Sequence, residues 1–148
     1  MIRQTSARFL RIISYLMIIN AVIWGLAPFD QFNAPAHFYL DLLDWPPGDA
    51  PAELDRNTKW LSAIGAGLLM ALAVMLLGIT CPALDEGDKR TVRVTAIALM
   101  VWFVIDSAGS IAAGAPANVF FNTVYLIPML VPLIFVRWDN DFGDVGSS

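Results

Sequence analysis

The chain has 148 residues, of which 57% are hydrophobic and 15% are charged, and its formal net charge is -4 at pH 7. Its mean hydropathy of +0.63 excludes an ordinary soluble domain, because one small core cannot bury so much apolar surface, and we expect the lipid bilayer to be its solvent. One cysteine and one histidine exclude an internal disulfide and disfavour a zinc site, and no basic patch indicates nucleic acid.

Four apolar segments are each long enough to cross a bilayer as a helix, which takes about 20 residues. They lie at about residues 9–28, 60–79, 92–112 and 118–136. None of them alternates polar and apolar residues as barrel strands do, so helices must satisfy their backbone groups in lipid. The predicted fold is an all-α, integral membrane four-helix bundle that forms a single domain, 1–148.

The connection at residues 30–59 is acidic and rich in proline. Within it, PAHFYLDLLDW at residues 35–45 predicts a short amphipathic helix with Phe38, Leu42 and Trp45 on its apolar face. Such a helix lies on the membrane surface. It either anchors the loop passively or covers the mouth of the bundle.

The second span carries a ridge of small residues, Ala63, Gly67 and Ala71, at intervals of four. This spacing is typical of close packing between membrane helices. The segment PALDEGDKR that follows, residues 82–90, is interpreted as a short polar turn. The C-terminal tail, residues 139–148, is acidic and ends in Gly and Ser, and we expect it to be disordered.

The basic residues indicate the orientation of the spans. Seven of the nine lie before or within the start of the first span, between the second and third spans, or after the fourth: Arg3, Arg8, Arg11, Lys89, Arg90, Arg93 and Arg137. Cytoplasmic segments are enriched in Lys and Arg. We therefore expect both termini in the cytoplasm and residues 30–59 outside.

Polar residues interrupt the hairpin of the third and fourth spans at intervals of four. Asp106, Ser110, Asn118 and Asn122 are placed symmetrically about Gly114. The short link around Gly114 makes the two spans antiparallel neighbours, so Ser110 is expected level with Asn118, and Asp106 level with Asn122. At 1.5 Å per residue, Asp106 lies about 12 Å below the turn.

An ionisable group inside the bilayer must face protein or water. We expect the polar stripe to face inward, with a protonated Asp106 exchanging two hydrogen bonds with the amide of Asn122. Tyr125 continues the stripe along the fourth span, and Asn20 of the first span lies at a compatible depth. The candidate binding or proton-titrating residues are Asp106, Ser110, Asn118, Asn122, Asn20 and Tyr125. They either hold the helices together or line a pocket.

The sequence contains no nucleotide-binding glycine loop, metal-ligand spacing or nucleophile–base signature, so we expect a non-enzymatic membrane protein. It would be an accessory subunit of a membrane complex or a binder of a small lipophilic molecule. A small proton-coupled transporter that uses Asp106 is the alternative. The expected partners are the bilayer and, beyond it, other membrane subunits or a second copy of the chain. No cofactor is indicated.

The layout of the chain resembles that of the small four-helix bacterial membrane proteins of the DoxX-like kind. The shared features are APFD at the end of the first span, Trp60 at the start of a small-residue second span, Asp106 in the third span and prolines in the fourth. The resemblance covers nearly the whole chain. It implies a compact bundle in the bacterial inner (plasma) membrane, and some relatives act as accessory subunits of redox systems.

Overall fold

The computed structural model describes residues 1–43 and 53–138. Its elements are α1 (Arg3–Gly25), α2 (Ala34–Leu43), α3 (Arg56–Met75), the π-helix η1 (Leu76–Thr80), α4 (Cys81–Glu86), α5 (Lys89–Ala112) and α6 (Ala117–Ile134). Within this part of the chain, α1, the continuous rod α3–η1–α4, α5 and α6 are long and apolar enough to cross a membrane. The predicted all-α four-helix bundle of a multi-pass membrane protein is confirmed.

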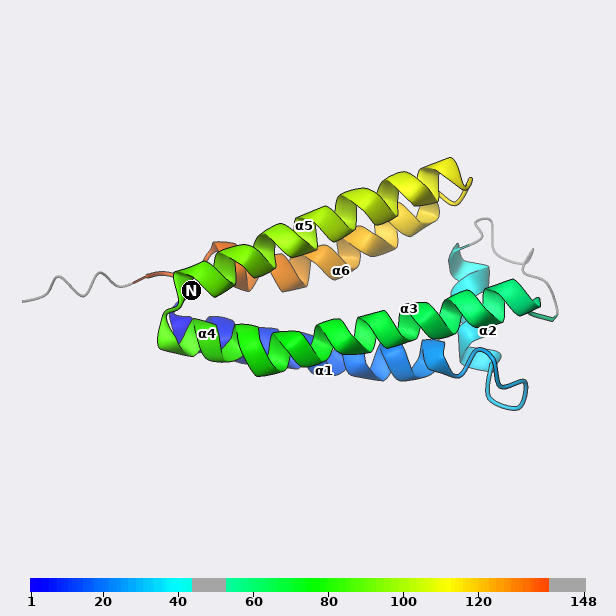
Figure 1. Ribbon diagram of the computed structural model, residues 1–148, viewed down its shortest axis with the longest axis horizontal. Coiled ribbons are helices and arrows are strands. Elements are labelled where there is room, and N and C mark those ends of the chain that lie inside the picture. The colour runs from blue at the N-terminus through cyan, green and yellow to red at the C-terminus, as the bar shows by residue number, and fades with distance from the viewer. Residues whose placement is uncertain (44–52, 139–148) are drawn as a thin grey trace, which may run out of the picture.

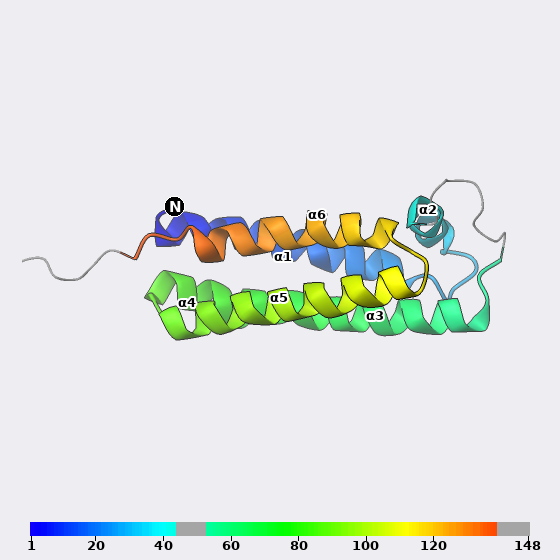
Figure 2. The same ribbon diagram turned by 90° about the horizontal axis from the view of Figure 1, so that it is seen from above.

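The bundle consists of two helical pairs. α1 packs along α3, and α5 packs along α6 (Figure 1). The pairs meet near α4 and separate toward the opposite end, where α2 lies across the long axis of the spans (Figures 1 and 2). We name these the α4 end and the α2 end. α1 also packs against α6, whereas α3 reaches α5 chiefly through η1 and α4.

The buried face of α1 repeats every three or four residues, as a helix-packing face requires. Its buried residues include Ala7, Leu10, Ser14, Met17 and Ala21. Where α1 meets α3, a Cβ atom added to Gly25 would lie 3.7 Å from the Cβ of Ala66. Small residues therefore let the two backbones approach closely, which is how helices associate in lipid without a hydrophobic driving force.

The small-residue ridge predicted for the second span does not pack within the chain. Ala63, Gly67 and Ala71 are exposed, and α3 instead buries Ser62 and Ala66 on its neighbouring stripe. The prediction was wrong because two adjacent stripes of α3 both consist of small residues. Only the rotation of the helix about its own axis chooses between them.

The polar turn predicted after the second span was also wrong in its first part, because the helix continues through Pro82 as α4. A proline ring collides with the carbonyl four residues earlier and removes an N–H donor. The wider π-turn of η1 directly precedes Pro82 and accommodates it. The chain reverses at Gly87, whose φ of 85° is left-handed, and the Asp88 N–H bonds to the Ala83 carbonyl at 2.8 Å, which completes a Schellman cap.

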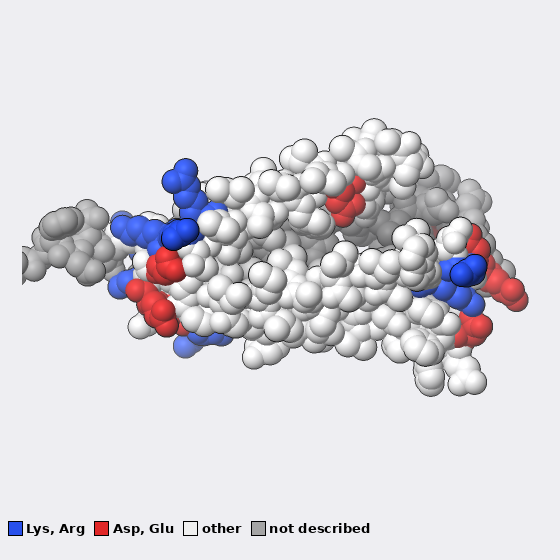
Figure 3. Space-filling model, in the orientation of Figure 1, with Lys and Arg blue, Asp and Glu red and all other residues white. Residues whose placement is uncertain are grey.

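Both chain ends of the described residues lie at the α4 end, together with most basic side chains (Figure 3). The Met1 ammonium donates to the Phe135 carbonyl at 2.6 Å, and Arg11 forms a salt bridge with Asp85. The predicted gathering of the basic residues at one end is confirmed. The tail that was expected to be disordered, 139–148, lies outside the described residues.

The predicted surface helix is present as α2. Its inward face contains Ala36, which is fully buried, and Leu40, which packs beside it. Phe38, on the predicted apolar face, is 67% exposed at the level where the spans end, as expected of a side chain in contact with lipid head groups. Trp45, predicted on the same face, lies outside the described residues.

Candidate functional site

The α5–α6 turn sets the depth of the polar residues. Gly114 adopts a φ of 80°, the Ala115 N–H bonds to the Ser110 carbonyl at 2.9 Å, and the Gly114 N–H bonds to the Ile111 carbonyl at 3.1 Å. These two bonds form a Schellman motif that ends α5. The following helix begins at once and runs back antiparallel, so the polar residues of α5 and α6 face each other just below the turn.

Asp106, Ser110 and Asn118 form one hydrogen-bonded cluster across the two helices. The Asn118 Nδ2 donates to Ser110 Oγ at 2.8 Å and to Asp106 Oδ1 at 3.2 Å. The Ser110 hydroxyl donates to the backbone carbonyl of Asp106 at 2.8 Å and lies 3.3 Å from its Oδ1. The expectation that Ser110 lies level with Asn118 is confirmed, and Asp106 Oδ1 accepts a hydrogen bond from Asn118.

The predicted pair of Asp106 and Asn122 was wrong. The Asn122 Nδ2 instead donates to Ser107 Oγ at 3.3 Å, and Asn122 is buried. Asp106 and Ser107 lie at nearly the same depth, but about 100° apart around α5. The predicted depth of Asn122 was therefore correct to within one residue. Its partner is Ser107, the residue next to Asp106 on the more buried face of α5.

A cavity of about 730 Å³ lies between the two helical pairs, and we name it the α2-end cavity. Its α5–α6 wall is mostly polar or aromatic and contains Trp102, Asp106, Asn118, Asn122 and Tyr125. The facing wall, from α1, α2 and α3, is mostly apolar and contains Trp24, Leu40, Leu61, Gly65, Leu68, Leu69 and Leu72. Figure 3 shows a single group of acidic atoms beside the hollow that separates the pairs.

Three acceptor atoms on the polar wall are available to a bound molecule. Asp106 Oδ2, Asn118 Oδ1 and Asn122 Oδ1 have no hydrogen-bond partner among the described residues, and none of the three is sealed inside the protein. Asn118 uses both of its amide hydrogens within the helical pair, whereas Asn122 uses one of its two. The wall therefore offers three free acceptors, and Asn122, Tyr125 and Trp102 supply donors beside them.

Asn20 does not join the Asp106 cluster, contrary to expectation. Its Nδ2 donates to the hydroxyl of Tyr39 on α2 at 3.3 Å, and the ring centroid of Tyr39 lies 5.9 Å from that of Trp24. Asn20 therefore attaches α2 to α1. Because Leu40 of α2 lines the cavity, the geometry supports a covering role for this helix over passive anchoring.

Sequence reasoning missed the apolar wall of the cavity. Leu61, Gly65 and Leu68 belong to a span in which nearly every residue is apolar, so no pattern distinguishes its cavity-facing side from its lipid-facing side. Tyr125, in contrast, was marked by its spacing from the polar residues of the fourth span, and it lines the cavity.

Among the described residues, no group of three or more His, Cys, Asp and Glu side chains is arranged to hold a metal ion. Cys81 is buried in α4, away from the polar cluster. The resemblance to DoxX-like proteins stays a prediction from layout. Comparison with family models, curated proteins and solved structures finds no match to the chain.

Proposed function

We propose that the chain is a non-enzymatic membrane protein that binds a small lipophilic molecule in the α2-end cavity. The observation that carries the proposal is the pairing of a polar wall with an apolar wall around about 730 Å³. This volume falls in the range of about 300–1,000 Å³ that is typical of small-molecule sites. Such a cavity accommodates an amphipathic ligand, with its polar group against α5 and α6 and its apolar body against α3.

The free acceptors on the polar wall suit a ligand whose head group donates hydrogen bonds. A hydroxyl, an N–H or an ammonium group satisfies Asp106 Oδ2 and the two asparagine carbonyl oxygens. If Asp106, Asn118 and Asn122 served only to join α5 to α6, their remaining acceptors would gain nothing from facing a cavity. We therefore favour binding over a purely structural role.

We further propose that the α4 end faces the cytoplasm of a bacterial cell and that the cavity lies in the outer half of the inner membrane. The basic residues gathered at the α4 end support this orientation, since cytoplasmic segments are enriched in Lys and Arg. The DoxX-like layout supports the choice of membrane.

Purification in mild detergent, followed by native mass spectrometry and small-molecule analysis, tests the binding proposal. A matched pair of variants on α3 provides the control. Gly65 lines the cavity and Gly67 does not, and a Cβ atom on either meets nothing within 4 Å. Gly65→Leu should fill the cavity and lose the bound molecule, whereas Gly67→Leu should retain it. Equal retention by both variants, or no molecule on the wild-type protein, would refute the proposal.

The same experiment separates the remaining alternatives. An accessory subunit would co-purify with a second protein in addition to the bound molecule, or in place of it. A proton-coupled transporter is favoured by the presence of the Asp106 carboxylate in the cavity wall. In that case Asp106→Asn should abolish pH-dependent uptake of the recovered molecule into proteoliposomes and leave its binding largely intact.

A further inference from the structure

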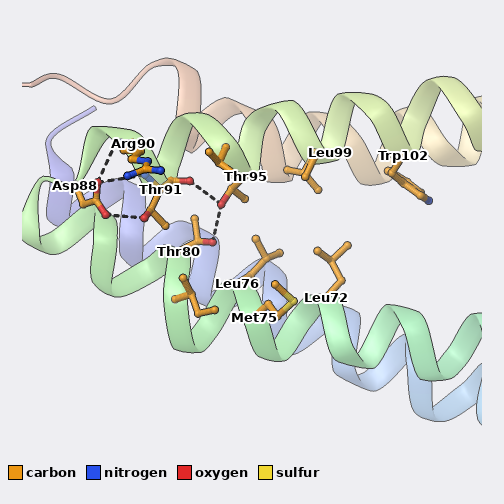
Figure 4. Close-up of a pocket in the computed structure, with 13 residues that line it drawn as sticks. Leu72, Met75, Leu76, Thr80, Asp88, Arg90, Thr91, Thr95, Leu99 and Trp102 are labelled. Carbon is orange, nitrogen blue, oxygen red and sulfur yellow. Dashed lines mark hydrogen bonds between the residues drawn. The ribbon is translucent and has the colours of Figure 1, made fainter.

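A second cavity of about 450 Å³ lies between the α3–η1 rod and α5, toward the α4 end, and we name it the α4-end groove. Figure 4 shows Asp88, Arg90 and Thr91 at one end of it and Leu72 and Trp102 at the other. Leu72 and Trp102 also line the α2-end cavity, so these two side chains stand between the cavities. The groove therefore adjoins the α2-end cavity at these two side chains, and its other lining residues are its own.

The groove changes from polar to apolar along its length. Between its two ends its lining includes Met75, Leu76, Ile79, Val94 and Leu99. Arg90 and Trp102 lie twelve residues apart on α5, which is about 18 Å. This length is somewhat more than half of a hydrocarbon core of about 30 Å, so the groove matches the depth of one membrane leaflet.

Threonine hydroxyls join the two sides of the groove near its polar end. Thr91 donates to Asp88 Oδ2 at 2.6 Å, and Thr95 donates to the Thr91 carbonyl at 3.0 Å. Because the Thr95 proton is used in this way, Thr80 of η1 is the donor in the 3.1 Å contact between Thr80 and Thr95 (Figure 4). These three hydroxyl protons are all satisfied internally, so the hydroxyls offer no donor to a ligand.

Arg90 is the available donor at the groove's polar end. Asp88 caps α5 by accepting the backbone N–H groups of Arg90 at 2.9 Å and Thr91 at 3.2 Å, so its charge is compensated mainly by the helix N-terminus and to a smaller extent by the Arg90 side chain. The guanidinium of Arg90 is exposed and has no hydrogen bond or salt bridge within the described part of the chain. A guanidinium in this position matches a phosphate group in geometry and charge.

We propose that the α4-end groove binds an anionic phospholipid, with its phosphate on Arg90 and one acyl chain along the apolar lining toward Trp102. The excess of basic residues at the α4 end favours an anionic lipid over a zwitterionic one, because a basic side chain near a membrane surface attracts anionic lipids. The proposal is independent of the ligand in the α2-end cavity.

Quenching of Trp102 fluorescence by brominated lipid tests the proposal. The full chain, with its other four tryptophans replaced by Phe, is reconstituted into phosphatidylcholine vesicles that contain phosphatidylglycerol. Bromine is placed near the methyl end of the acyl chains of one lipid or the other. One basic residue near the surface attracts an anionic lipid by about 1 kcal/mol. Phosphatidylglycerol should therefore be about fivefold more abundant beside Trp102 than in the bilayer as a whole.

Two arginine variants separate a specific site from a general attraction to the basic end. Arg90→Gln should abolish the enrichment. Arg93→Gln removes the same charge one turn along α5, where the side chain does not line the groove, and it should keep the enrichment. Equal quenching by both lipids in the parent protein, or equal loss in both variants, would overturn the proposal.

Ala98→Phe provides a second, steric test that leaves Arg90 in place. Ala98 lines the groove, and a phenyl ring there should displace the acyl chain and reduce quenching by both brominated lipids. Far-UV circular dichroism establishes that each variant folds. Unchanged quenching in a folded Ala98→Phe protein would contradict an acyl chain in the groove.

Discussion

A double-mutant cycle between Asp106 and Asn118 tests the observed hydrogen-bond pairing of α5 with α6. In the structure, the Asn118 Nδ2 donates to Asp106 Oδ1 at 3.2 Å, whereas Asn122 donates to Ser107. We expect Asp106→Ala and Asn118→Ala to be coupled in their effect on the free energy of unfolding. Asp106→Ala and Asn122→Ala should be nearly additive, because no hydrogen bond joins these two side chains.

The expected coupling corresponds to the one interhelical bond that joins the two side chains, from Asn118 to Asp106. Such bonds contribute about 0.6 kcal/mol on average in membrane proteins, with a maximum of about 1.7 kcal/mol. The 3.2 Å separation is at the long end for an N–H···O bond, so we expect a coupling of about 0.6–1 kcal/mol, in the lower part of this range. For Asp106 with Asn122, the deviation from additivity should stay within about 0.5 kcal/mol.

The assay is equilibrium unfolding of the purified protein in mixed micelles, with increasing sodium dodecyl sulfate in a mild detergent, followed by far-UV circular dichroism. Ser107→Ala with Asn122→Ala serves as a positive control, because this pair also shares one hydrogen bond. A larger coupling for Asp106 with Asn122 than for Asp106 with Asn118 would refute the pairing described above.

Three further predictions concern the turns and the orientation. Gly114→Ala should lower the free energy of unfolding by about 1–2 kcal/mol, because φ is 80° there and the cost is one of backbone strain, since nothing lies within 4 Å of an added Cβ atom. Gly109→Ala, inside α5, should instead raise the free energy of unfolding by up to about 1 kcal/mol. Effects of the same sign would contradict the left-handed turn. Hydrogen bonds from Thr91 hold the pKa of Asp88 below its ordinary value of 3.8, so its stabilising effect is present above pH 3.8 and is lost as the pH falls through the lower folded-state pKa. Asp88→Asn keeps a capping oxygen but should flatten this acid-range dependence in circular dichroism, and an unchanged slope would count against the cap. A membrane-impermeant maleimide should label Gln31→Cys on intact cells and Glu86→Cys only after permeabilisation, while buried Cys81 stays unlabelled; the reverse pattern would invert the proposed orientation.

The number of spans and the depth of the polar residues were predictable from the sequence. Apolar length alone identifies segments that can cross a bilayer. The short link around Gly114 makes α5 and α6 antiparallel, so counting residues from the turn places Ser110 beside Asn118 and Asn122 within one residue of its partner Ser107. Both inferences depend on distances along the chain, which the sequence states directly.

The rotation of each helix about its axis was not predictable in the same way. Asn122 bonds to Ser107 rather than Asp106, and α3 buries Ser62 and Ala66 rather than the adjacent stripe, because neighbouring positions on these helices are chemically similar. In soluble proteins the polar face of a helix reveals its rotation. In lipid both faces are apolar, so packing against other helices decides the rotation, and this requires the full structure.

Two further differences have local causes. The π-turn that precedes Pro82 lets a helix pass a residue that usually ends one, which no simple rule of helix termination anticipates. Asn20 pairs with Tyr39 because α2 folds back over the end of α1. The path of that loop is set by contacts between residues far apart in sequence.

The most direct test of whether Asp106 faces an open cavity between the two helical pairs is its labelling by a lipophilic carbodiimide. Such a reagent reacts with protonated carboxyl groups inside membranes. At mildly acidic pH we expect mass spectrometry of proteolytic peptides to find the adduct at Asp106. Gly65→Leu should block the reaction by filling the cavity from α3, and Gly67→Leu should leave it unchanged. An unlabelled Asp106 in the wild-type protein, or equal labelling in both glycine variants, would contradict an open cavity at this carboxylate.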